Sequence, residues 1–179
     1  IPWIRFMVSS SPSSDQVQSL ANCGSGVTSL VRNIAPVVRT LADAGNTLTL
    51  SQINTLTGGA GVDNLTGGDG VDVFDYNVLS ESGVGAAVRD LIADFVAGTD
   101  KLDFSTLDAN TGVAGNQDFT FNATDGALFT GAGQIVYHYE GSGGSEITVI
   151  EGNVNNNLGT DFQVALVGHI TLSASDFVL

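Results

Sequence analysis

The stretch Gly58-Gly-Ala-Gly-Val-Asp-Asn-Leu-Thr66 is followed directly by Gly67-Gly-Asp-Gly-Val-Asp-Val-Phe-Asp75, so the chain repeats one nine-residue pattern. The shared pattern is Gly-Gly-x-Gly-x-Asp-x-U-x, in which U is a large apolar residue. The period continues beyond the glycines, because oxygen-bearing residues and apolar residues each recur every nine positions. The oxygen column is Asn54, Asp63, Asp72 and Glu81, and the apolar column is Leu56, Leu65 and Phe74.

Each position of this repeat has a physical role. Glycines allow turns with positive φ and leave backbone carbonyl oxygens able to point at an ion. The aspartate adds a hard anionic oxygen, and about six to eight such oxygens suit calcium better than magnesium. The apolar residue forms a short strand that becomes buried only when the next turn stacks on it. The repeat therefore predicts short strands that stack turn on turn, with calcium bound between the turns.

The candidate calcium ligands lie in the two full repeats and in the turn after them. These repeats resemble the RTX calcium-binding β-roll, in which sites form between turns on the same side, that is, between every second turn. The resemblance implies that the turn from Gly58 to Asp63 pairs with the turn that reaches Glu81. The turn through Asn54 lacks glycines, so we expect about one to three ions rather than a long row. The candidates in these turns are Gly58, Gly59, Gly61, Asp63, Gly67, Gly68, Gly70, Asp72 and Glu81.

The charge of the chain is strongly negative and unevenly distributed. The 179 residues carry 19 acidic and 5 basic side chains, a net charge of −14. Five Lys and Arg residues are too few for the phosphate contacts of a nucleic-acid-binding protein. Residues 49–179 hold 17 of the acids against Arg89 and Lys101, so this part repels itself when compact unless its charges are widely spaced or cations bind. The shift in charge predicts two segments, an unassigned one at 1–48 and a calcium-binding module at 49–179.

Three further features limit the class of protein. The single cysteine, Cys23, excludes a disulfide framework within the chain. No run of 18 apolar residues is present, so we expect no insertion into a membrane. Because the sequence starts at Ile1 rather than at Met, we expect it to be a fragment or a processed product of something larger.

The N-terminal segment contains a pattern typical of a helix. Apolar residues fall at spacings of three and four from Val27 to Leu41, and Pro36 is expected to kink or end the helix. Such a helix binds a partner or a membrane surface, or it packs on the rest of the chain or on a missing upstream domain. Its polar face has few Lys and Arg residues, which argues against the membrane surface.

The second half of the module alternates between apolar and polar residues, as strands do. Strands are predicted at 119–121, 134–140, 146–151 and 162–167, and Gly141-Ser-Gly-Gly-Ser145 predicts a hairpin loop. Together with the resemblance to the RTX β-roll, which implies a β-roll and a β-sandwich-like module, these strands predict an all-β protein. In it a short parallel β-roll joins an antiparallel β-sandwich-like body, with a partly helical N-terminal segment. The run 151–161 carries oxygens at alternating positions like a calcium loop, but Asn stands where a strong loop has Asp, which favours a plain loop.

The sequence carries no recognisable catalytic motif. Its two histidines, His138 and His169, are isolated, so the zinc motif HExxHxxGxxH is missing. The nucleophile motif G-x-S-x-G is missing as well, and the glycine-rich turns lack the Lys and the helix of a phosphate-binding loop. We therefore predict a non-catalytic module.

The repeats resemble the RTX calcium-binding β-roll. The run from Val88 to Leu107, which contains Asp-Leu-Ile-Ala-Asp-Phe and Gly-Thr-Asp-Lys-Leu-Asp-Phe-Ser, resembles the segment after the last repeat in the C-terminal module of serralysin-type metalloproteases. It is also similar to the R modules of alginate epimerases, and the strands 134–140 and 162–167 and the ending 172–179 extend the resemblance. Within the matched segment, Asp94 and Asp100 flank Gly98 and are candidates to close a calcium site against the last turn, or else are solvated acids at strand ends.

The resemblance also implies a biological setting. In that family the module ends a larger secreted protein, such as a metalloprotease, and a type I secretion exporter carries it to the extracellular space. The ending Asp176-Phe-Val-Leu179 is similar to the export signal, and we expect it to serve export rather than stability. The alternative function is the C-terminal piece of a secreted adhesin or surface-layer protein that mediates cell-surface contact. An upstream passenger such as a zinc-protease or lyase domain would support the first reading, and long upstream repeats would support the second.

Overall fold

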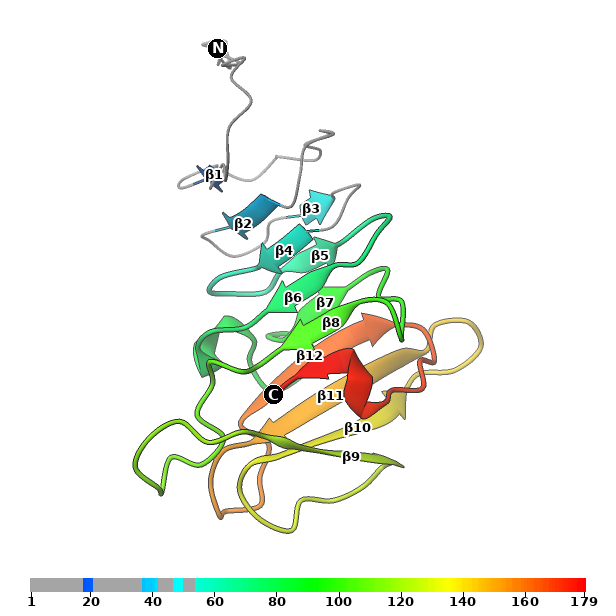
Figure 1. The fold of residues 1–179 in the computed structure, drawn as a ribbon. Helices are drawn as coiled ribbons and strands as arrows, with labels where there is room; N and C mark the ends of the chain where they lie inside the picture. Colours follow the sequence, from blue (N-terminus) through cyan, green and yellow to red (C-terminus); the bar gives the residue numbers. More distant parts are fainter. Residues whose placement is uncertain (1–17, 21–36, 42–46, 50–53) are drawn as a thin grey trace.

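The fold consists of two sheets that face each other across an apolar core, as Figure 1 shows. The computed structural model describes residues 18–20, 37–41, 47–49 and 54–179, and it describes side chains from residue 55 onward. Within these residues the chain forms strands and two short 3-10 helices, η1 (Leu79–Glu81) and η2 (Ala174–Asp176). No helix in the described part is long and apolar enough to cross a membrane.

The first sheet is parallel throughout. Its six strands follow the order β1 (Gln18–Leu20), β2 (Val37–Leu41), β4 (Asn54–Thr57), β6 (Val73–Asp75), β8 (Lys101–Asp103) and β13 (Phe177–Val178). The apolar side chains of neighbouring strands stack in register, and these residues are Leu56, Phe74, Leu102 and Phe177. The last strand of the chain therefore completes a sheet that the repeats begin.

The second sheet joins the roll to the antiparallel strands. Its seven strands follow the order β3 (Thr47–Thr49), β5 (Asn64–Thr66), β7 (Asp90–Ile92), β12 (Phe162–Val167), β11 (Ile147–Asn153), β10 (Gln134–Glu140) and β9 (Thr120–Asp125). The pairs from β3 to β12 are parallel, the pairs among β10, β11 and β12 are antiparallel, and β9 is parallel to β10. We call the stacked turns up to β8 the roll, and strands β9 to β12 the body.

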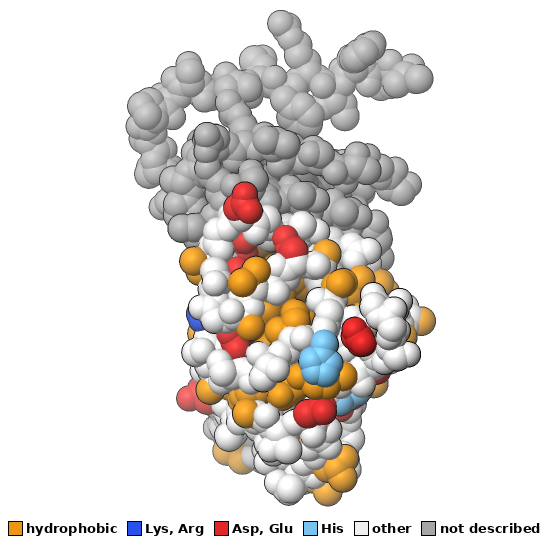
Figure 2. All heavy atoms as spheres, turned by 90° about the vertical axis from the view of Figure 1, so that its right-hand side faces the viewer, with side chains coloured by type: hydrophobic (Ala, Val, Ile, Leu, Met, Phe, Trp, Pro, Cys, Tyr) orange, Lys and Arg blue, Asp and Glu red, His pale blue; other side chains and the backbone are white. Residues whose placement is uncertain are grey.

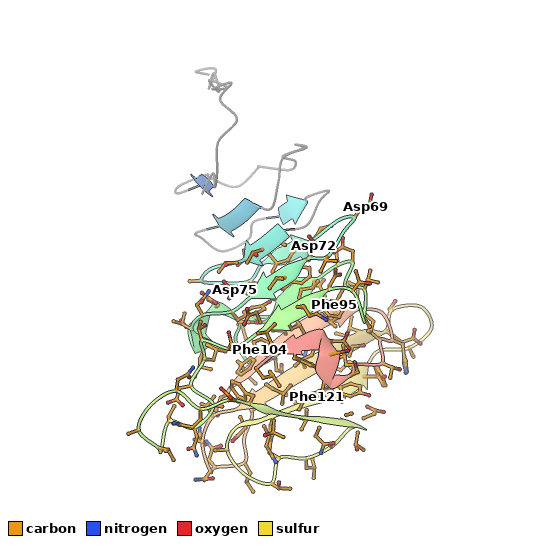
Figure 3. All side chains as sticks on the ribbon, viewed as in Figure 1. Asp69, Asp72, Asp75, Phe95, Phe104 and Phe121 are labelled. Atoms are coloured by element: carbon orange, nitrogen blue, oxygen red, sulfur yellow. The ribbon has the colours of Figure 1, made fainter. Side chains whose placement is uncertain are left out.

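The core confirms the predicted apolar column. Leu56, Leu65 and Phe74 are all at most 1% exposed, because consecutive turns alternate between the two sheets and point these side chains inward. Below them lies an aromatic cluster around Phe104, whose ring centroid is 5.2 Å from that of Phe162 and 5.6 Å from that of Tyr76. Figure 3 shows Phe95, Phe104 and Phe121 following this core from the roll down to the body.

The predicted strands of the body are confirmed, and so is the hairpin loop that joins β10 to β11. The predicted helix at 27–41 is wrong where the structure describes it, because Val37–Leu41 is strand β2, paired in parallel with β4. The β-branched residues Val37, Val38 and Thr40 fit a strand, and Pro36 disfavours a continuous helix. Residues 27–36 lie outside the described residues.

The division of the chain at residue 48 stays a prediction. Strands β2 and β3 lie on its N-terminal side or across it, and they pair with β4 and β5 of the repeats. The roll therefore includes strands from both sides of this position.

Candidate metal centre

The two glycine-rich loops lie at opposite edges of the roll. Residues 58–63 connect β4 to β5 at the left edge in Figure 1, and residues 67–72 connect β5 to β6 at the right edge. The left edge continues with residues 76–89, between β6 and β7, and the right edge with residues 93–100, between β7 and β8. The nine-residue oxygen column thus divides into two, with Asp63 at the left edge and Asp72 at the right edge.

The same hydrogen-bond arrangement occurs at both edges. On the left, the Asp63 N–H donates to Asp90 Oδ1 at 2.8 Å, and the Leu91 N–H donates to the Asp63 carbonyl at 2.9 Å. On the right, the Asp72 N–H donates to Asp100 Oδ1 at 3.0 Å, and the Lys101 N–H donates to the Asp72 carbonyl at 2.8 Å. The four carboxylates are almost fully covered, since Asp63, Asp72, Asp90 and Asp100 are at most 2% exposed.

The glycines bring each loop close to its own aspartate. At Gly67, an added Cβ would lie 2.6 Å from Asp72 Oδ2, and at Gly58 it would lie 2.9 Å from Asp63 Oδ2. Only a residue without a side chain fits against these carboxylates. The later glycines of each loop have positive φ, with values of 89° and 117° at Gly59 and Gly61, and 88° and 132° at Gly68 and Gly70. The repeat thus encodes a tight loop wrapped around a buried carboxylate.

Asp94 and Asp100 lie against the right-edge loop. Asp94 accepts hydrogen bonds from the Gly67 N–H at 2.9 Å and the Gly68 N–H at 2.8 Å. Besides its bond to Asp72, Asp100 accepts the Val96 N–H at 2.8 Å. Their role as calcium ligands stays a prediction, but both carboxylates fix the backbone of the last two turns. Figure 2, which faces this edge, shows acidic side chains and little of the colour of Lys or Arg.

The left edge differs from the expected arrangement. Glu81 lies in the facing turn and is buried, but its carboxylate accepts the Asn77 N–H at 2.7 Å, and Asp90 occupies the position opposite Asp63. The reason is that this turn is longer than a standard repeat, so the facing residue comes 27 positions after Asp63. At the right edge the facing residue comes 28 positions after Asp72, so no single spacing in the sequence identifies these two residues.

Buried negative charge accumulates at the left edge. Burial, together with the charges of Asp63 and Glu81, raises the pKa of Asp90 to about 7. Burial also raises the pKa of Glu81, and burial and the Asp90 carboxylate raise the pKa of Tyr76 well above its usual value. Folding the chain therefore brings together groups that resist ionisation, and a cation at this edge would relieve that cost.

This cost predicts a pH dependence in the absence of metal. The raised pKa of Asp90 means that the folded chain holds a proton that the unfolded chain releases between about pH 4 and pH 7, so stability falls as pH rises through this range. With a chelator present, the folded fraction measured by circular dichroism should be larger at about pH 5 than at about pH 8. The free energy of unfolding should differ between these two pH values by a few kcal/mol at most, since one pKa unit corresponds to about 1.4 kcal/mol. Asp90→Asn should reduce it, and an equal difference in that variant would contradict the assignment to Asp90.

The donor chemistry at both edges fits calcium. Within residues 55–179, no three His, Cys, Asp and Glu side chains are arranged to hold a metal ion, so backbone oxygens would have to complete either site. Carboxylate and carbonyl oxygens are the ligands that calcium prefers, and a site of one or two carboxylates with carbonyls requires no nitrogen or sulfur.

The run 151–161 consists of the end of strand β11 and the loop that leads to β12, and its assignment as a plain loop stays a prediction. The Asn155 side-chain amide donates to both carboxylate oxygens of Asp161 at 2.9 Å, and the Asn153 amide donates to the Gly159 carbonyl. These amide N–H groups donate hydrogen bonds to the oxygens that would have to bind a cation. The two histidines lie in the body, where His138 is 3.2 Å from Glu140 and the His169 ring stacks on Tyr139 at 3.5 Å between centroids.

The tail packs into the fold, which argues against the expectation that it contributes little to stability. Asp176 is 1% exposed, and its Oδ1 accepts the Gly98 N–H of the right edge at 2.5 Å. Phe177 is 8% exposed and pairs with Leu102 of β8. The partner strand lies about 75 positions earlier in the chain, and pairing at such a distance leaves no local signal in the tail itself.

Comparison with known proteins agrees with this arrangement. The sequence pattern of the family described as "Peptidase M10 serralysin C terminal" matches residues 21–179. The chain belongs to this family. Serralysin A from Dickeya chrysanthemi is 36% identical over 106 residues, which are 59% of this chain and 20% of that protein. The chain therefore spans about a fifth of the length of this relative.

A solved structure extends the similarity to the fold. The solution structure of the AlgE6R2 subunit from the Azotobacter vinelandii mannuronan C5-epimerase is 26% identical and has a TM-score of 0.53. The similarity covers 79% of this chain and 80% of that one. The serralysin C-terminal module and the epimerase R modules are non-catalytic domains, and RTX-type modules of this family bind calcium in general.

Proposed function

We propose that this chain is a calcium-binding RTX module that folds outside the cell and ends a larger secreted protein carried by a type I exporter. The observation that carries the proposal is the set of four buried aspartates, two at each edge of the roll. They lie in a segment with 17 acidic and 2 basic residues, which cannot neutralise them from within. Burying the negative charge of several carboxylates is costly, so a bound dication is the simplest source of compensation.

Each edge supplies one proposed site. At the left edge, Asp63 and Asp90 would hold the ion with carbonyl oxygens of Gly58 and Gly61, and Glu81 adds negative charge nearby. At the right edge, Asp72 and Asp100 would do so with carbonyl oxygens of Gly67 and Gly70, while Asp94 fixes the loop.

The difference in calcium concentration between the cytosol and the extracellular space determines where this module would fold. Extracellular calcium modules bind at about 10⁻⁴ to 10⁻³ M, far above cytosolic calcium. Inside the cell the acidic chain would repel itself and stay unfolded, a state that an exporter can thread. Outside, calcium would fill both edges and the chain would fold.

Calcium titration of the whole chain tests the proposal. At about pH 7.5, circular dichroism should show little native β signal in a chelator and a cooperative gain on adding calcium, whereas magnesium at equal concentration should have a much smaller effect. A full native β signal in the chelator at that pH would sink the proposal.

Two variants of the same loop make this test specific. Asp72→Asn removes a buried carboxylate and should raise the calcium midpoint by about tenfold or more, as expected for loss of a charged ligand. Asp69→Asn removes the same charge three positions earlier, where the side chain is exposed at the tip of the loop in Figure 3, and should leave the midpoint nearly unchanged. Equal midpoints in the two variants would contradict the assignment.

A further inference from the structure

Strand β7 is the junction between the roll and the body. On one side it pairs with β5, and the Leu91 N–H donates to the carbonyl of Asp63 at 2.9 Å. On the other side it pairs with β12, with Asp90 opposite Val164. Asp90 is its first residue and faces Asp63, so the left-edge site borders directly on the body.

The backbone of Asp90 is tied to β12 through one hydroxyl. The Asp90 N–H donates to Ser82 Oγ at 2.8 Å, and the Ser82 hydroxyl donates to the backbone carbonyl of Gln163. Ser82 is 2% exposed, so water does not compete for these bonds. The position of Asp90 therefore depends on β12 being in place.

The residue before Asp90 makes a second connection to the body. Arg89 is 5% exposed and donates through both terminal nitrogens to the Glu140 carboxylate of β10, at 3.1 and 2.6 Å. It also donates to Gln163 Oε1 at 3.3 Å. These hydrogen bonds hold the pKa of Glu140 at about 2, so this carboxylate stays charged against the guanidinium.

Gln163 completes the connection from the side of the body. Its Oε1 also accepts the Gly85 N–H at 2.8 Å, and its Nε2 donates to Glu151 of β11 at 2.6 Å. The left-edge turn is thus held at Ser82, Gly85 and Arg89 by side chains and backbone of β10 and β12. We call Ser82, Arg89, Glu140 and Gln163 the latch.

We propose that the latch couples cation binding at the left edge to formation of the body, so that roll and body order together at one calcium concentration. The proposal rests on the calcium-binding function proposed above. When the body is unformed, Arg89 and Ser82 have no partners and Asp90 is not fixed opposite Asp63. When Asp90 is held by a cation, its neighbours Arg89 and Ser82 stand where β10 and β12 must dock. Arg89 and Ser82 are positioning residues in this scheme.

Hydrogen exchange of the full chain, followed by mass spectrometry during a calcium titration, tests the coupling. Peptides covering β5 and β6 report on the roll, and peptides covering β11 and β12 report on the body. In the unsubstituted chain both sets should become protected at the same calcium midpoint. In Arg89→Met the two midpoints should separate by about tenfold, a typical coupling between residues of one network.

Lys101→Met is the matched control, because it also removes one positive charge from the roll. Lys101 lies on β8 and donates to the Ser175 carbonyl, away from the latch. It should leave the roll and body midpoints equal. A common shift of both midpoints in Arg89→Met would overturn the latch, because a merely stabilising contact moves them together.

If Arg89→Met does not fold at any calcium concentration, Glu140→Gln provides a second test of the coupling. The amide keeps the shape of Glu140 and removes its charge, so roll and body midpoints should again separate, whereas equal midpoints would overturn the coupling. If the hydrogen-exchange protection of the unsubstituted chain did not depend on calcium, both the calcium proposal and the latch would be overturned. Calcium-dependent protection with equal midpoints in Arg89→Met and in Glu140→Gln would overturn the latch alone.

Discussion

Deleting Asp176–Leu179 should lower the free energy of unfolding of the calcium-saturated protein by more than about 3 kcal/mol, the lower range for loss of one buried Phe side chain. Phe177 is 8% exposed, and its ring centroid lies 4.5 Å from that of Phe121 and 6.2 Å from that of Phe104. The deletion also removes Asp176, which accepts the Ser173 N–H at 2.7 Å and the Gly98 N–H at 2.5 Å. The tail therefore supports both the core and the right edge.

Urea unfolding at saturating calcium measures this effect, and Phe177→Ala should account for most of it. Val178→Ser is the matched control, because Val178 is the next residue and is 39% exposed, so the urea midpoint should stay close to that of the unsubstituted chain. A truncated chain with an unchanged midpoint would show that β13 contributes nothing to the fold.

Phe177→Ala and Val178→Ser also separate a folding role of the tail from the proposed export role. In the folded module Phe177 is covered, so an exporter that recognises the tail would have to do so before the chain folds. Val178→Ser should preserve folding, so a loss of secretion in this variant, from a host with a matching exporter, would support a signal in the tail. Loss of secretion only in variants that unfold would assign the tail to stability alone.

The repeat made much of the fold predictable, because its period is local. A glycine-rich loop, an aspartate and one apolar residue recur within each turn, so the sequence indicates the stacked turns and their buried apolar column. The strands of the body were equally predictable, since the alternation in 134–140 and 162–167 needs no distant partner to be recognised.

Features that depend on distant pairing were not predictable in the same way. Asp90 faces Asp63 only because the turn containing η1 inserts extra residues while the register of β5 and β7 is kept. Strand β2 was not predicted because its apolar residues also fit the spacing of three and four that is typical of a helix. Its pairing with β4, a distant contact, decides between the helical and the strand period. The latch was missed because Arg89 and Glu140 are 51 positions apart and neither belongs to a motif.

Gly67→Ala should raise the calcium midpoint, because it adds a methyl group directly against the Asp72 carboxylate. The new Cβ would lie 2.6 Å from Asp72 Oδ2 and 2.8 Å from its Cγ, closer than such atoms approach in proteins. Because Asp72 is fully buried and its N–H is fixed to Asp100, the carboxylate cannot simply turn away into solvent. The loop or the carboxylate must move, at a cost of about 1–3 kcal/mol for overpacking even before binding is considered.

Gly131→Ala is the control for this change, since a Cβ there meets nothing within 4 Å and the backbone does not have the positive φ that favours glycine. It should leave the calcium midpoint unchanged and the stability equal or slightly higher, because alanine restricts the unfolded chain. Isothermal titration calorimetry with calcium, alongside circular dichroism, separates lost affinity from lost folding in Gly67→Ala. If the two alanine variants bound calcium equally well, the close packing of the loop on Asp72 would have no role in holding the ion. If calcium affinity falls in Gly67→Ala and in Asp72→Asn but not in Gly131→Ala, the defect lies at the Asp72 carboxylate. The reason is that the first two changes affect the same carboxylate in different ways.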